Sequence, residues 1–197
     1  INLYLDIMKI FTIKNFGKKM ETLNIVGHNT KNDRVDYDFY PTPEIATLKL
    51  LEKESFKGDI WECACGDGAI SNILKKKGYL VFNSDIIDRG FNDETIDFLN
   101  TDKKIDNIIT NPPFKLSLQF ALHGLKSVSS KMVLFQKLVF LEGIKRKKEL
   151  FSLNKLKNIY VISNRLKFKG YKTGGLMCFA WFVFDVNYNG KPTIDWI

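Results

Sequence analysis

Short runs of apolar and β-branched residues alternate along this chain with segments that have the features of helices. The stretch "GDIWECACGDGAISNILKKKGY" predicts a strand at 59–64, a turn that contains glycines, and a helix at 69–77. A strand followed by a helix and another strand is typical of a parallel sheet, because parallel neighbours need a long crossover connection. We therefore expect an α/β fold with a doubly wound, mostly parallel sheet.

The rest of the chain extends this pattern. In "YPTPEIATLKLL" we expect a helix with Thr42 as its N-cap and Pro43 at its first helical position. Further strands are predicted at 79–85, 104–110, 131–140, 157–163 and 176–186, and further helices at 116–128 and 141–152. Because no helix separates the last two strands, they should pair as an antiparallel hairpin at one edge of the sheet.

Residues 1–36 show no clear periodicity, and we interpret them as an N-terminal extension. Residues 37–197 should then form a single domain, since the length of the chain suits one core. The part of the chain that follows residue 114 is mostly needed to complete the sheet. We therefore expect no separate target-recognition domain.

The chain is basic, with a formal net charge of +8 and a pI near 9.3. A basic surface favours a polyanionic partner through counterion release, and nucleic acid is the commonest such partner. No apolar run approaches the roughly 20 residues that span a bilayer, and the first residues lack the pattern of a signal peptide. We expect an intracellular protein whose three cysteines are core residues.

The glycine-containing turn "ECACGDGA" should lie at the edge of the sheet where ligands bind, because it follows a strand directly. Gly66 and Gly68 permit a sharp turn and a close approach of the backbone to a ligand. Glu62, at the end of the strand, can bind an ammonium or hydroxyl group, and Asp85, at the end of the next strand, can accept hydrogen bonds from ribose hydroxyls. A structural turn and a turn-capping Asp are the alternatives. The spacing is not that of a pyrophosphate-binding loop.

The succession "FYPTP", "WECACGDGA", "NSDI", "IDFLN" and "ITNPPF" resembles the S-adenosylmethionine-dependent amino-methyltransferases. The resemblance covers about residues 37–185 and is closest to the small phage-type DNA adenine-N6 methyltransferases. It implies a doubly wound, Rossmann-like methyltransferase sheet with a C-terminal antiparallel hairpin. It also implies S-adenosyl-L-methionine as the cofactor.

The resemblance also implies which residues bind this cofactor. They are Tyr40, Pro41, Thr42, Glu62, Ala64, Gly66, Gly68, Asp85, Ile86, Asp97 and Phe98. By this match the turn after the first strand holds the methionine part, and the segment 40–42 closes over it. Asp85 holds the ribose, while the adenine ring contacts Ile86 and the "IDFLN" element. Ala64 stands where the family usually has its first glycine.

The strand at 104–110 ends in "NPPF", residues Asn111, Pro112, Pro113 and Phe114, which match the family's catalytic motif. An aromatic amine is a poor nucleophile because its lone pair is delocalised, so a site must accept both amino hydrogens. The Asn111 side-chain oxygen and the Pro112 carbonyl are two such acceptors, on a corner that proline makes rigid. Phe114 offers a face on which a base outside its stack can lie. The alternative is a rigid strand exit packed by an aromatic residue.

The segment "NRLKFKGYKTGG" combines basic residues with aromatics, which suits contact with a nucleic-acid backbone and stacking on bases. The residues expected to bind nucleic acid are Arg165, Lys167, Phe168, Lys169 and Lys172. A mobile hairpin loop is the alternative. The histidines at 28 and 123 are too few and too scattered to form a zinc site with the cysteines, so we expect no metal.

Together these patterns favour a DNA adenine-N6 methyltransferase that transfers the methyl group in line to a flipped base, without a covalent enzyme intermediate. An RNA base methyltransferase and a protein glutamine methyltransferase use the same kind of corner and remain alternatives. A non-catalytic nucleic-acid-binding protein with this fold is an alternative from a different class.

Overall fold

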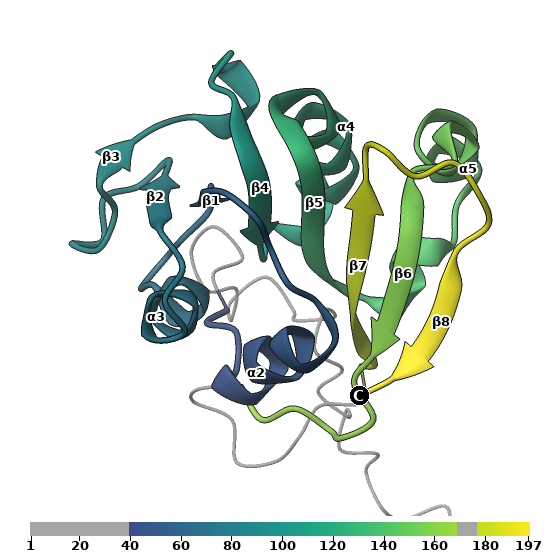
Figure 1. The fold of residues 1–197 in the computed structure, drawn as a ribbon, viewed down its shortest axis with the longest axis horizontal. Coiled ribbons are helices and arrows are strands. Elements are labelled where there is room, and N and C mark those ends of the chain that lie inside the picture. The colour runs from purple at the N-terminus through teal and green to yellow at the C-terminus, as the bar shows by residue number, and fades with distance from the viewer. Residues whose placement is uncertain (1–39, 169–176) are drawn as a thin grey trace, which may run out of the picture.

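Eight strands form one sheet in the part of the chain that the computed structural model describes, residues 40–168 and 177–197. In the order of the sheet they are β3 (Glu94–Thr95), β2 (Val81–Asp85), β1 (Ile60–Glu62), β4 (Ile105–Thr110), β5 (Val128–Lys137), β7 (Phe179–Asp185), β6 (Leu156–Val161) and β8 (Thr193–Trp196) (Figure 1). The expected N-terminal extension, residues 1–36, lies outside the described residues.

The sheet is parallel from β3 through β5, and antiparallel where β7 pairs with both β5 and β6. The expected doubly wound, mostly parallel sheet and the antiparallel pairing of β6 with β7 are therefore confirmed. The pairing does not lie at the very edge as expected, because β8 pairs with the outer side of β6. β8 is parallel to β6 and absent from the sequence prediction, since it is only four residues long and all four are exposed.

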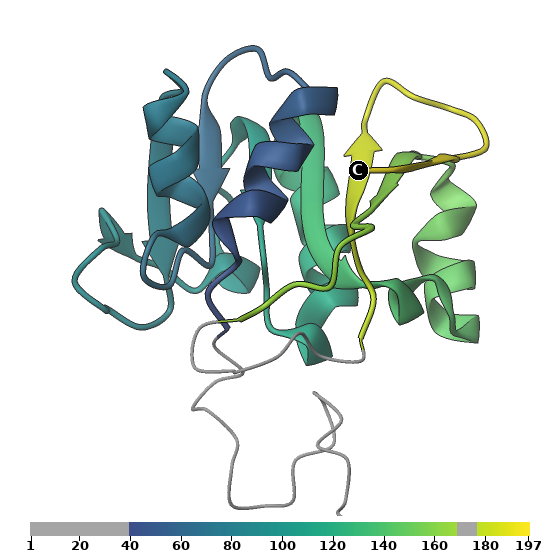
Figure 2. The same ribbon diagram turned by 90° about the horizontal axis from the view of Figure 1, so that it is seen from below.

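Helices cover both faces of the sheet (Figures 1 and 2). The helices are α2 (Glu44–Lys53), α3 (Ala69–Lys76), α4 (Ser117–Ser127) and α5 (Ile144–Glu149). Leu50 of α2 and Leu74 of α3 belong to one core cluster, and Phe120 of α4 and Leu150, just after α5, belong to the other. Each apolar helix face thus buries against a sheet whose central strands are apolar on both sides.

Short 3₁₀ turns occupy several of the connections. They are η2 (Phe98–Asn100), η3 (Phe114–Leu116), η4 (Leu138–Leu141) and η5 (Phe151–Leu153). Of these, η3 follows β4 after the three residues 111–113, and η4 follows β5 directly, at the edge of the sheet where parallel strands end. The residues of this edge form the site described below.

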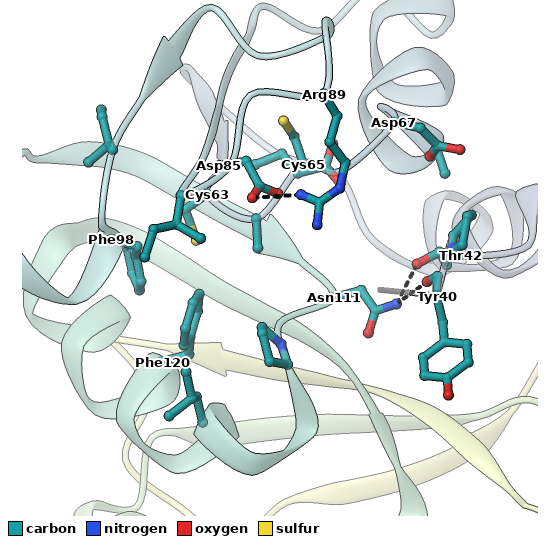
Figure 3. Close-up of a pocket in the computed structure, with 18 of the residues that line it drawn as sticks. Tyr40, Thr42, Cys63, Cys65, Asp67, Asp85, Arg89, Phe98, Asn111 and Phe120 are labelled. Atoms are coloured by element: carbon teal, nitrogen blue, oxygen red, sulfur yellow. Dashed lines mark hydrogen bonds and ion pairs between the residues drawn. The ribbon is translucent and has the colours of Figure 1, made fainter. Parts of the chain in front are cut away.

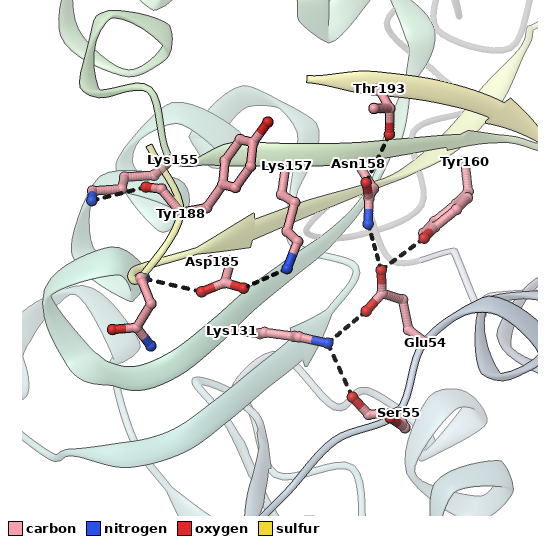
Figure 4. Close-up of polar contacts among 11 residues, drawn as sticks. Glu54, Ser55, Lys131, Lys155, Lys157, Asn158, Tyr160, Asp185, Tyr188 and Thr193 are labelled. Atoms are coloured by element: carbon pink, nitrogen blue, oxygen red, sulfur yellow. Dashed lines mark hydrogen bonds and ion pairs between the residues drawn. The ribbon is translucent and has the colours of Figure 1, made fainter. Parts of the chain in front are cut away.

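A buried carboxylate ties the end of α2 to the other half of the sheet (Figure 4). Glu54 caps α2 and accepts hydrogen bonds from Lys131 Nζ (2.6 Å), Asn158 Nδ2 (2.7 Å) and Tyr160 Oη (2.7 Å). Burial alone would raise the pKa of Glu54, but these three donors outweigh burial and lower it. The network fixes the C-terminal end of α2. The N-terminal end of this helix follows the segment 40–42, which lines the site described below.

Candidate cofactor-binding and catalytic site

A pocket opens at the carboxyl edge of the sheet, where β2, β1 and β4 end side by side (Figure 3). It encloses about 760 Å³ of space, open solvent at its mouth included. Residues expected from the sequence that line it are Tyr40, Pro41, Thr42, Glu62, Ala64, Asp85, Ile86, Asp97, Phe98, Asn111 and Pro113. Segments that are distant in the sequence thus converge on one cavity.

Gly66 and Gly68 shape the turn and do not line the pocket. Both have a positive φ, of 57° and 79°, which an L side chain rarely adopts. A Cβ at Gly68 would lie 2.1 Å from the ring of Phe91. The Gly66 N–H donates to Asp85 Oδ2 at 2.9 Å, so this glycine positions an acidic side chain of the pocket.

Asp85 lies at the end of β2 and is buried, with three donors around its carboxylate. Besides Gly66, the Ile87 N–H donates to Oδ1 at 3.0 Å, and Arg89 Nη1 forms an ion pair with Oδ1 at 3.0 Å. Arg89 itself lines the pocket and was missed at the sequence level. Its only sequence signal is its place four residues after the strand-ending Asp, in a loop without periodicity.

Glu62 is 2% exposed at the end of β1, and the Ser71 backbone N–H of α3 donates to its Oε2 at 2.8 Å, with the Ser71 hydroxyl hydrogen-bonded to the same oxygen. Burial, together with the nearby carboxylates of Asp67 and Asp85, raises the pKa of Glu62 to about 8, although the bonds from Ser71 oppose the shift. At neutral pH Glu62 is therefore mostly protonated in the protein without ligand.

The hydrogen bonds around Ser71 are consistent with a proton on Glu62. Its hydroxyl lies within hydrogen-bonding distance of both Glu62 Oε2 and Asn83 Oδ1, yet it has one hydrogen to donate. The orientation of the Asn83 amide is set by Asp93, which accepts from Asn83 Nδ2 at 2.9 Å. A proton on Glu62 completes the chain, because Glu62 can then donate to Ser71 while Ser71 donates to Asn83.

Asn111 follows β4 and is held by the segment that precedes α2 (Figure 3). Its Nδ2 donates to the Tyr40 carbonyl at 3.1 Å and to Thr42 Oγ1 at 2.9 Å. A backbone carbonyl only accepts, so the Tyr40 contact fixes which end of the amide is the nitrogen. Both amide hydrogens are used here, and the side-chain oxygen of Asn111 is the group left to accept hydrogens from a substrate.

This arrangement corrects the expected cap of α2. The helix begins at Glu44 with Pro43 at the N-cap position, and no side chain caps it. Thr42 lies one residue earlier, and its hydroxyl accepts from Asn111 instead. The competing contact could not be read from local sequence, because it joins two segments that meet only in the folded sheet.

The other two residues of the "NPPF" motif do not line the pocket. Phe114 is half-buried at the start of η3, and its ring centroid lies 6.2 Å from that of Phe179. Lys137 Nζ lies 4.4 Å from the same ring centroid of Phe114. The ring is thus held by contacts with Lys137 of β5 and Phe179 of β7. In the sequence, Pro112 and Pro113 separate it from Asn111.

The residues expected to bind nucleic acid fall into three groups. Arg165 and Lys167 are exposed, whereas Lys169 and Lys172 lie outside the described residues. Phe168 is 6% exposed and packs against Tyr40 and Phe179, with ring centroids 6.3 and 5.0 Å apart. The expectation that Phe168 stacks on a base does not fit this burial, since its ring is part of the core.

The cysteines divide differently from the prediction. Cys63 and Cys65 are buried as expected, and burial raises the pKa of Cys65 to about 12, so its thiol stays protonated and is a weak nucleophile. Cys178 is exposed, because it lies in the connection just before β7.

Within residues 40–168 and 177–197, no group of three or more His, Cys, Asp and Glu side chains could hold a metal ion. No helix in the same ranges is both long enough and apolar enough to cross a membrane.

Comparison with known proteins gives similarity in structure but not in sequence. No family model and no curated protein matches the chain. A candidate RNA methyltransferase from Pyrococcus horikoshii is similar with a TM-score of 0.59 and 14% identity, over 79% of this chain and 90% of that one. A candidate class I S-adenosylmethionine-dependent methyltransferase from Listeria monocytogenes has a TM-score of 0.57 and 12% identity, over 87% of this chain and 68% of that one.

A third similar structure is the modification subunit of a candidate type I restriction enzyme from Vibrio vulnificus. Its TM-score is 0.56 at 12% identity, and the match covers 79% of this chain but only 46% of that chain. Identities this low show a shared fold. The fold of this chain is that of the class I S-adenosylmethionine-dependent methyltransferases.

Proposed function

We propose that the protein is an S-adenosylmethionine-dependent methyltransferase that acts on the N6 amino group of adenine in DNA. The observation that carries the proposal is the oriented amide of Asn111 at the edge of a pocket with two buried acidic side chains. The methyltransferase fold supports the assignment as an S-adenosylmethionine-dependent methyltransferase, and the "NPPF" corner supports an amino group as the acceptor.

The residues of the pocket fit the proposed cofactor, which supplies a methyl group on a sulfonium sulfur. Glu62 in its ionised form can hold the ammonium group of the methionine part. A carboxylate has about four acceptor positions, and three donors already face Asp85, so one position remains for a ribose hydroxyl without displacing Arg89. Ile86, Ile96 and Phe98 line the pocket near these groups and provide apolar contact for an adenine ring.

The corner residues prepare the acceptor nitrogen. The Asn111 oxygen and the Pro112 carbonyl each accept one amino hydrogen, which draws the lone pair out of conjugation with the ring and aims it at the methyl group. The nitrogen would then form its bond to the methyl carbon as the bond from that carbon to the sulfonium sulfur breaks, with the electron pair of the broken bond passing to sulfur, and the nitrogen would lose one hydrogen as a proton to water. Positioning of this kind supplies much of the rate gain in a transfer without a covalent enzyme intermediate.

The choice of DNA as the acceptor rests on the resemblance and on charge. The net charge of +8 favours a nucleic acid over a protein glutamine. RNA is the second candidate, because charge does not separate it from DNA and one similar structure is described as a candidate RNA methyltransferase. The complete "NPPF" corner speaks against a non-catalytic binding protein.

The acceptor is tested by offering cofactor with a radiolabelled methyl group to duplex DNA, RNA and a protein in parallel. We expect label in DNA, recovered as N6-methyladenine after digestion to nucleosides. Asn111→Ala should lower transfer by about 100-fold or more, since it removes an acceptor at the reacting group, while Asn72→Ala on the exposed face of α3 serves as the control. Label found only in RNA or protein would contradict the DNA proposal, and a wild-type protein that binds no cofactor by calorimetry would contradict the enzyme.

Thr42→Val tests the positioning of Asn111, because it keeps the shape of the side chain and removes the acceptor of one amide hydrogen. We expect kcat to fall about tenfold, which corresponds to one hydrogen bond of roughly 1.4 kcal/mol, with little change in the KM of the cofactor. Thr47→Val is the matched control, since Thr47 is a buried threonine of α2 whose hydroxyl has no hydrogen-bond partner among the described residues. Equal kcat values for the two variants would rule out this role of Thr42.

The raised pKa of Glu62 predicts that cofactor affinity depends on pH. If the ammonium group binds only the ionised carboxylate, affinity should rise about tenfold per pH unit up to a pH of about 8 and then level off. Calorimetry in buffers with different ionisation enthalpies should detect the release of one proton. Glu62→Gln should abolish both effects, whereas Glu52→Gln on the exposed face of α2 should retain them.

The same pKa sets the sign of a stability effect. Between pH 4.5 and about 8 the folded protein keeps a proton that the unfolded chain has lost, so this group contributes stability that decreases as pH rises through that window. Glu62→Gln should flatten the decrease in melting temperature over this range. A decrease of unchanged steepness in Glu62→Gln would show that Glu62 is ionised in the free protein.

A further inference from the structure

An exposed apolar and basic surface follows β5, outside the pocket. We call it the η4–α5 surface, and it consists of Val139, Leu141, Ile144, Lys145, Lys147 and Lys148. Its three aliphatic side chains are 52%, 38% and 76% exposed, and its three lysines are exposed as well. Three large exposed apolar residues lie within six positions of the sequence, unlike scattered exposed residues, which need no explanation.

The fold holds these aliphatic side chains outward. Phe140 lies between Val139 and Leu141 and is 4% exposed, with its ring 5.2 Å from that of Phe182. Arg146 closes the turn, since its Nε donates to the Glu142 carbonyl at 2.6 Å and its guanidinium lies 5.4 Å from the Phe140 ring centroid. Phe140 occupies the buried position and the contacts of Arg146 stabilise the turn, so Val139 and Leu141 face solvent.

The surface begins beside the catalytic corner. β4 and β5 are parallel neighbours with Thr110 opposite Leu134, so both strands end at the same edge of the sheet (Figure 1). Lys137, the last residue of β5, reaches the ring of Phe114, and η4 starts at the next residue. The surface therefore starts, along the chain, directly after a residue that contacts the last residue of the "NPPF" corner.

We propose that the η4–α5 surface binds double-stranded DNA next to the extruded base, an inference that rests on the proposed function. The segment 137–148 has five cationic side chains and one carboxylate, Glu142, which complements a phosphate backbone. Lysine is depleted at protein–protein interfaces, so exposed aliphatic residues flanked by lysines fit nucleic acid better than a protein partner. Aliphatic side chains that contact unstacked base pairs are a known device of proteins that distort a duplex.

In this arrangement the two kinds of side chain have separate tasks. Lys145, Lys147 and Lys148 bind phosphates and fix the position of the duplex, a contact that carries no sequence information. Val139 and Leu141, nearest to the corner, contact the bases that lose their stacking partner when one base leaves the helix. The lysines should therefore affect binding, whereas the aliphatic residues should affect transfer to a duplex.

The lysines are tested with a double charge reversal, Lys147→Glu with Lys148→Glu. Its matched control is Lys76→Glu with Lys77→Glu at the end of α3, which changes the net charge of the protein equally and also lies at a helix C-terminus. Fluorescence anisotropy with a labelled duplex of about 25 base pairs should show binding weakened about tenfold or more, and a salt slope less steep by about 2. The α3 variant should stay within about threefold of wild type.

The aliphatic residues are tested with Leu141→Ser against Leu153→Ser, a leucine of η5 outside the surface that is somewhat more exposed, at 46% against 38%. Leu141→Ser should lower methyl transfer to duplex DNA several-fold and leave transfer to single-stranded DNA unchanged, because a single strand needs no base extrusion. Leu153→Ser should leave both unchanged. Melting curves and cofactor calorimetry on every variant test whether the fold and the pocket are intact.

The outcomes separate this inference from the proposed function. If wild type binds cofactor but the two double lysine variants bind duplex equally well, the surface proposal is wrong and the methyltransferase proposal stands. If the η4–α5 variant loses affinity only for RNA, or only for a protein partner, the surface proposal is equally overturned. If wild type binds no cofactor, the proposed function fails even where the lysine result is as expected.

Discussion

The parallel register of β2, β1 and β4 places three strand ends at one edge of the sheet, and the geometry of the site depends on this alignment. Ile60 of β1 lies opposite Val81 of β2 and Asn107 of β4, so the three parallel strands end at the same edge of the sheet. Glu62 and Asp85 end two of these strands, and Asn111 follows the third. Backbone hydrogen bonds of the sheet thus set the spacing of side chains that are far apart in the sequence, and each side chain needs only local contacts to fix its orientation.

Those local contacts assign different tasks to the two buried acids. Asp85 is paired with Arg89 and accepts two backbone N–H groups, whereas Glu62 shares one serine hydroxyl with Asn83. At Glu62 burial and the neighbouring carboxylates outweigh the bonds from Ser71 and raise the pKa. A cationic ligand would stabilise the ionised form of Glu62, so the pocket is electrostatically suited to a positively charged group.

The sequence predicted the fold well where periodicity and strand ends carry the information. The alternation of apolar runs and helices predicted the doubly wound sheet, and the strand-ending acids, the segment 40–42 and Asn111 do meet in one pocket. The failures occurred where a contact between distant segments decides the outcome. Thr42 bonds to Asn111 instead of capping α2, and Phe168 in a basic segment packs into the core. β8 was missed because its residues show no burial pattern.

The central claim is that the oxygen of the Asn111 amide faces the reacting end of a cofactor bound at the ends of β1 and β2. A crystal structure with S-adenosylhomocysteine, the product of the proposed reaction, tests it most directly. In such a crystal we expect the homocysteine amino group at Glu62, the ribose at Asp85 and the sulfur on the side of the pocket that Asn111 borders. A ligand bound elsewhere, or one whose adenine lies against Asn111 and whose sulfur points away, would contradict the account.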